Sequence, residues 1–156
     1  SARPKRRDSS NTKEVCEPRI IGGHKMKEIK AKIQDIMEAY PNMNIEGISL
    51  PILYTKRESP AQRKERLQML RESLLTDVGC VEVATVIKWL RTSNKARRTK
   101  LMNTKYSSFG LKTYVEQDMG VGISNGSFIV GAMICGCRAE QVKASENAHL
   151  NLRVKG

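Results

Sequence analysis

The spacing of apolar residues along the chain predicts mostly helical structure. Between Gly23 and Pro41, apolar side chains recur at steps of three and four residues, which places them on one side of a helix. This side consists of Met26, Ile29, Ile33, Ile36, Met37 and Tyr40. The pattern predicts an amphipathic helix over 25–40, and we expect its apolar side to pack into a core rather than on a membrane surface.

Residues that favour helix starts predict a second helix. Ser59 can cap free amides, Pro60 suits the first helical position and Gln62 completes a capping box. A helix is therefore predicted over 60–75. The loop before it contains an apolar fragment, 48–53, which suits a short extended segment.

A third helix is predicted over 78–91, with Thr76 and Asp77 at its start. It is apolar on nearly every side, so we expect it to be the central buried element. Its β-branched residues also suit a strand, and periodicity does not separate the two. The basic segment 93–100 follows directly, so a buried helix would hold this segment against a rigid body.

The last third of the chain combines two helical patterns with a strand pattern. We predict helices over 109–119 and 124–135, joined by the turn Gly120-Val121-Gly122, and a hairpin of 136–143 with 148–155. This order resembles that of winged helix-turn-helix domains, over residues 107–156 only. The resemblance implies a sequence-specific DNA-binding regulator with the second helix in the major groove.

The second helix departs from what such a domain requires. It is rich in apolar residues such as Phe128, Ile129 and Val130, whereas a recognition helix exposes polar side chains to base edges. Ser124, Asn125 and Ser127 in its first turn can reach phosphates, but we favour a core or subunit-interface helix. Glu116 also stands in the first helix where a small residue is usual.

The charge distribution points to a polyanionic partner. The 156-residue chain has a formal net charge of +12, and no acidic residue lies between Glu82 and Glu116. A cationic run that the chain does not neutralise is best explained by an external polyanion. The interval contains eight cations, which we predict to bind phosphates: Lys88, Arg91, Lys95, Arg97, Arg98, Lys100, Lys105 and Lys112.

A second group of cations lies at the N-terminus. Arg3, Lys5, Arg6 and Arg7 stand in a segment with too few apolar residues to form a core, so residues 1–23 are predicted to be a flexible basic arm. We predict that these four cations also contact nucleic acid. The cluster is compatible with a nuclear import signal as well.

Candidate catalytic and metal-binding groups are few. His24 and His149 are the only histidines, and no glycine-rich phosphate loop or paired-carboxylate motif is present, so we predict no enzyme. Cys135 and Cys137 could bind zinc with Cys80 or His149, but buried inert thiols are the better interpretation. We therefore predict neither a metal nor a cofactor. Four dispersed cysteines favour a reducing intracellular compartment, with nuclear and virion-associated locations both compatible.

These patterns predict a mainly α protein. We expect a compact helical domain of about five helices over 24–156, with a small C-terminal β-hairpin and the N-terminal arm. The favoured function is non-catalytic binding of RNA or DNA through backbone phosphates, in a nucleocapsid or other nucleoprotein assembly and with homo-oligomers allowed. The alternatives are the winged helix-turn-helix regulator and a helical adaptor for an acidic protein or anionic surface. No apolar run is long enough for a membrane span.

Overall fold

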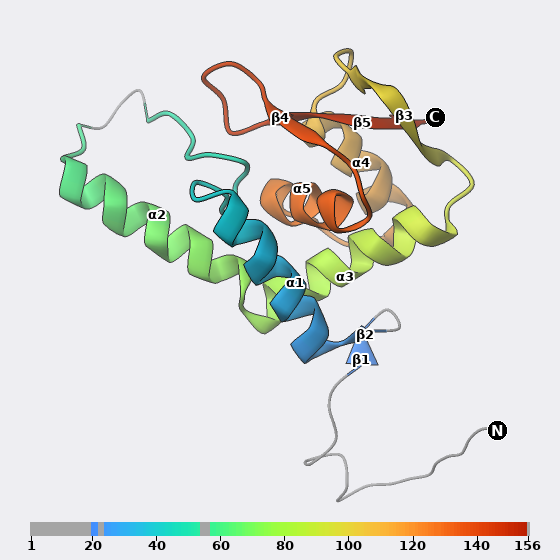
Figure 1. Ribbon diagram of the computed structural model, residues 1–156, viewed down its shortest axis with the longest axis horizontal. Helices are drawn as coiled ribbons and strands as arrows, with labels where there is room; N and C mark the ends of the chain where they lie inside the picture. The colour runs from blue at the N-terminus through green and yellow to red at the C-terminus, as the bar shows by residue number, and fades with distance from the viewer. Residues whose placement is uncertain (1–19, 22–23, 54–56, 156) are drawn as a thin grey trace, which may run out of the picture.

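Figure 1 shows the computed structural model, which describes residues 20–21, 24–53 and 57–155. Helices make up most of this part of the chain, which confirms the predicted mainly α class. All the predicted helices are present, with ends shifted by at most one residue. Their bounds are α1 (Met26–Ala39), α2 (Pro60–Leu74), α3 (Asp77–Thr92), α4 (Ser108–Met119) and α5 (Asn125–Ile134).

The sheet near the C-terminus is larger than the predicted hairpin. β4 (Ala139–Gln141) and β5 (Ala148–Val154) form that hairpin, while β3 (Ala96–Asn103) pairs antiparallel with the other edge of β5. The basic segment after α3 is thus an edge strand of a three-stranded sheet, which the sequence analysis did not predict. Two strands of two residues each, β1 (Ile20–Ile21) and β2 (His24–Lys25), form a separate small sheet. β1 lies within the segment 1–23 assigned to the arm, and β2 directly follows that segment.

Local capping explains where α2 and α3 begin. The Ser59 hydroxyl accepts from the Gln62 amide at 3.1 Å, and the Gln62 side chain accepts from the Ser59 amide at 2.9 Å. This is the predicted capping box. At the start of α3, the Thr76 hydroxyl accepts from the Gly79 amide at 3.1 Å. Both helices therefore begin where side-chain oxygens satisfy free amides.

Arg71 has a structural role rather than a place on the solvated side of α2. Its guanidinium donates to the carbonyl oxygens of Met37, Tyr40 and Met43 at 3.1, 3.0 and 2.9 Å. These carbonyls lie at and just beyond the C-terminus of α1, where helical partners are lacking. Arg71 thereby joins α2 to α1. The apolar fragment 48–53 between these two helices forms no strand, although the sequence suited a short extended segment there.

Helix α3 is central as predicted, since it contacts all four other helices, but α5 is the more completely buried helix. Every residue from Asn125 to Ala132 is buried, whereas α3 exposes Val78 and Val81. α5 contacts α1, α3 and α4 (Figure 1). Its residues Ile129 and Val130 belong to one core cluster with α1, and Phe128 belongs to a second with α4 and β5.

Candidate functional site

The basic strand β3 bends over a large bulge. Its first half pairs in regular register, with Arg98 opposite Leu152, but Asn103 is already opposite Leu150. The four residues 99–102 therefore face the single residue Asn151. The Asn151 side chain holds this bulge by donating to the Thr99 carbonyl oxygen at 2.9 Å. A bulge bends its strand and increases its twist, so the two ends of β3 can line one cavity.

That cavity is an open hollow on the surface of the sheet. It has a volume of about 780 Å³ and is bounded by the loop after α3, both ends of β3, the turn 104–106, α4 and the end of β5. We call it the cationic cavity, because five of its lining residues are cations and none is acidic. The cations are Lys95, Arg97, Lys105, Arg153 and Lys155.

Two of these cations face each other directly. Arg97 on β3 and Arg153 on β5 are cross-strand partners in the antiparallel ladder, so their side chains leave the same face of the sheet. Both are exposed, and neither side chain forms an ion pair or hydrogen bond with a described residue. Like charges in this arrangement repel each other and destabilise the free protein.

Lys95 is the one cation of the cavity that has a carboxylate partner among the described residues. Its ammonium lies 3.0 Å from an Asp118 oxygen, and the same carboxylate accepts from the Trp89 indole at 2.8 Å. These two hydrogen bonds, that of Trp89 first, hold the pKa of Asp118 below its ordinary value. Asp118 thus neutralises part of the basic segment, which the sequence analysis did not foresee.

A buried asparagine shapes the rim of the cavity. Asn103 accepts from the amides of Lys105 and Tyr106 at 3.0 and 3.1 Å and donates to the Leu152 carbonyl oxygen at 3.1 Å. This side chain fixes the turn after β3 and with it the positions of Lys105 and Tyr106. The Lys105 ammonium lies 5.4 Å from the centre of the Tyr106 ring. Tyr114 of α4 completes the aromatic part of the lining.

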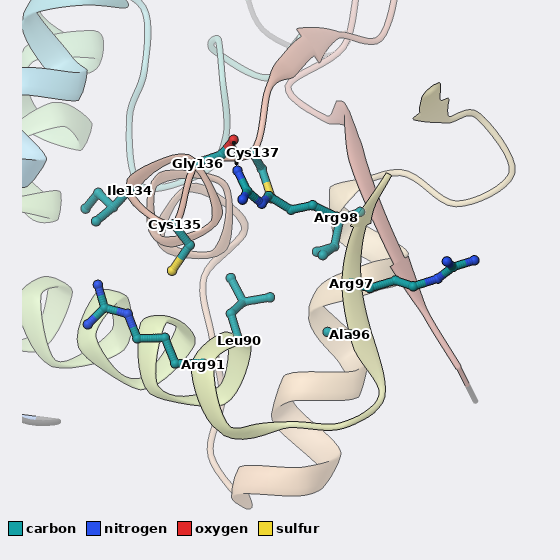
Figure 2. A pocket seen from close by; sticks show the side chains of 10 residues that line it. Leu90, Arg91, Ala96, Arg97, Arg98, Ile134, Cys135, Gly136 and Cys137 are labelled. Carbon is teal, nitrogen blue, oxygen red and sulfur yellow. Dashed lines mark hydrogen bonds between the residues drawn. The ribbon is translucent and has the colours of Figure 1, made fainter. Parts of the chain in front are cut away.

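The opposite face of β3 borders a smaller pocket of about 400 Å³, which we call the thiol pocket. Figure 2 shows that Arg98 points into it whereas Arg97 points away. Arg98 donates to the Gly136 carbonyl oxygen at 3.2 Å, and Cys135, Cys137 and Arg91 lie around it. Successive residues of a strand point to opposite faces, so the side chains of these adjacent arginines point to opposite sides of β3, although Arg97 also borders the thiol pocket.

The two thiols of this pocket have pKa values above the ordinary value. Burial, together with the neighbouring Cys135, raises the pKa of Cys137 to about 11, and burial raises the pKa of Cys135 as well. Both thiols are free, and their raised pKa values leave little thiolate near neutral pH, which disfavours a nucleophile. No three His, Cys, Asp or Glu side chains gather to hold a metal ion in the described chain.

The remaining predicted cations within the described residues do not line the cationic cavity. Lys112 of α4 is only 9% exposed and forms an ion pair with Glu116 at 3.0 Å, so we remove it from the phosphate-binding set. Lys88 and Lys100 are exposed on α3 and on the bulge. The arm cations Arg3, Lys5, Arg6 and Arg7 lie outside the described residues.

The N-terminus of α5 is occupied by the chain itself. Glu82 accepts from the Ser124 amide and the Ser127 hydroxyl at 3.1 and 2.8 Å, and Asn125 donates to the Glu46 carbonyl oxygen at 3.0 Å. The Gly126 amide donates to the Ile45 carbonyl oxygen at 2.9 Å. This helix is buried and its first turn is covered, so it cannot serve as the recognition helix of the winged helix-turn-helix hypothesis.

Sequence reasoning missed several residues of the cavity. Arg153 and Lys155 stand on the polar side of the predicted last strand, and this alternation was the signal that they are exposed. Their partner strand was not recognised, so they were not joined to the basic segment. Tyr106, Tyr114 and Asn103 carry no local pattern that places them at a site.

Comparison with protein-family models, curated proteins and solved structures finds no match to this chain. None of the helices in the described ranges combines the length and apolar character that crossing a membrane requires. The assignment of the candidate site therefore rests on its geometry and charge.

Proposed function

We propose that this protein binds nucleic acid without catalysis, by holding backbone phosphates at the cationic cavity. The observation that carries the proposal is the opposed pair Arg97 and Arg153. Like charges across a ladder are unfavourable in the free protein, and a phosphate between them replaces repulsion with two charge-assisted hydrogen bonds. Lys105 and Lys155 at the same cavity add to the positive potential.

The wider role that suits this binding mode is that of a component of a nucleoprotein assembly. Phosphate contacts position a protein on nucleic acid but do not read its sequence. The cations of the N-terminal arm would add further contacts of the same kind. Affinity is then similar for unrelated sequences and falls steeply with salt.

Salt-dependent binding tests the proposal. If the protein forms four or five ion pairs with backbone phosphates, two of them from Arg97 and Arg153 to a shared phosphate, a plot of log affinity against log salt has a slope of about −3 to −5. Replacing Arg97 with Gln is expected to make this slope less steep by about one unit. The same replacement relieves repulsion, so the free energy of unfolding stays constant or rises by about 0.5 kcal/mol. If Arg97 had a purely structural role, its replacement would lower the free energy of unfolding.

Lys64 provides the matched control. It is exposed on α2, far from β3 in Figure 1, so Lys64→Gln removes the same charge elsewhere and should leave the slope unchanged. A parallel titration with polyglutamate of similar length distinguishes a nucleic-acid partner from an acidic protein partner. Equal affinity for polyglutamate, or an unchanged slope in Arg97→Gln, contradicts the proposal.

A further inference from the structure

The cationic cavity is hollow enough to hold a single nucleotide. Its volume of about 780 Å³ falls within the range of about 300–1,000 Å³ that is typical of small-molecule sites. A surface that only follows phosphates along a duplex has no need of such a hollow. The shape of the site therefore indicates a ligand that enters the hollow, which its charge alone does not.

The lining joins aromatic rings to cations. Tyr106 is 44% exposed at the rim, and its backbone is held by the buried Asn103. Aromatic side chains next to a positively charged groove are the usual means of holding unpaired bases, because every base has a face on which a ring can stack. In a duplex both faces of each base are already stacked, so an aromatic ring cannot reach them without base flipping.

We propose that the cationic cavity takes one unpaired nucleotide of a single strand, with its base against Tyr106 and its phosphate between Arg97 and Arg153. This inference rests on the proposed function and specifies its ligand. The chemistry is common to RNA and DNA strands. The anchored turn 104–106 presents Tyr106 in the free protein, so little ordering is needed when the strand binds.

The test compares strands and variants by fluorescence anisotropy. Labelled single strands of RNA and of DNA and the blunt duplex of the same sequence are titrated at one salt concentration. We expect the better-bound single strand to bind at least about tenfold more tightly than the duplex. Tyr106→Ala should weaken single-strand binding by about tenfold, while Tyr106→Phe retains it, because stacking needs the ring and not the hydroxyl.

Two controls separate this inference from the proposed function. Phe109 is 56% exposed on α4 but does not line the cavity, so Phe109→Ala should leave single-strand affinity unchanged. Tyr106 carries no charge, so its replacement should leave the salt slope intact. If duplex and single strand bind with equal affinity and Tyr106→Ala does not change that affinity, this inference is overturned while the proposed function stands. Absence of binding to any strand or duplex would overturn both proposals.

Discussion

Gly126 shows how one residue sets the packing around α5. A Cβ built on Gly126 would overlap the Asn44 carbonyl oxygen and would lie 2.7 Å from the Ile45 carbonyl carbon. A glycine at this position lets another group approach the helix closely. In the structure the approaching group is the chain's own loop 44–47, whose backbone cannot move away without breaking the bond between the Gly126 amide and Ile45.

Gly126→Ala is therefore expected to destabilise the protein by about 3 kcal/mol, because the added methyl group meets backbone atoms rather than a flexible side chain. Urea denaturation measures the change in the free energy of unfolding. Gly122→Ala is the control, since a Cβ on Gly122 meets nothing within 4 Å. Equal stability of the two variants would show that the loop does not press on α5.

At the scale of elements, β3 differs most from expectation. Its sequence, Ala-Arg-Arg-Thr-Lys-Leu-Met-Asn, lacks the apolar and polar alternation of a half-buried strand. β3 is an edge strand held by β5, whose residues lie about fifty positions later, and its bulge projects Leu101 at 78% exposure. Helices α1 to α5 were predictable because their caps and periodicities are local, whereas this pairing is not.

Hydrogen exchange should reveal the difference between the two strands. β5 has a neighbour on each side, while the bulged residues 99–102 face only Asn151. We expect amides in the bulge to exchange on the order of a hundredfold or more faster than those of residues 150–152 in β5. Native-state exchange followed by NMR gives both rates in one experiment. Comparable protection in the two segments would mean that the bulge is part of the rigid sheet.

At the scale of the whole molecule, the cations form separate groups and not one continuous face. Arg97 and Arg98 diverge to opposite sides of β3, and acidic residues from α4 neutralise two members of the predicted set. The pairing of Lys112 with Glu116 spans four residues of one helix and was within reach of sequence reasoning. The pairing of Lys95 with Asp118 was not, because it joins segments that only the fold brings together.

The same carboxylates predict a loss of stability in acid. Burial raises the pKa of Glu116, but hydrogen bonds from the Ile123 amide and Lys112 outweigh it and leave that pKa low, and the pKa of Asp118 is also lowered. The unfolded chain therefore takes up protons first as the pH falls through the ordinary carboxyl range, near about pH 4. Stability should be constant from pH 7 to pH 5 and should decrease below that range, until the lowered folded-state pKa values are passed.

Urea midpoints at pH 7, 5 and 3 measure this loss. Glu116→Gln has no carboxylate at this position to take up a proton, so its midpoint should decrease less between pH 5 and pH 3 than that of the native protein. A midpoint that rises toward pH 3 would contradict the assigned direction of the two shifts.

The amino-acid sequence by itself determined the mainly α class, the positions of the helices and the presence of an excess of positive charge. These properties depend on neighbours within a few residues or on composition alone. Only the tertiary structure decided which cations share a cavity, which are neutralised and which helix is buried most completely. Those outcomes depend on strand register and on contacts between distant segments, because a shift of one residue in β3 would send Arg97 to the opposite face of the sheet.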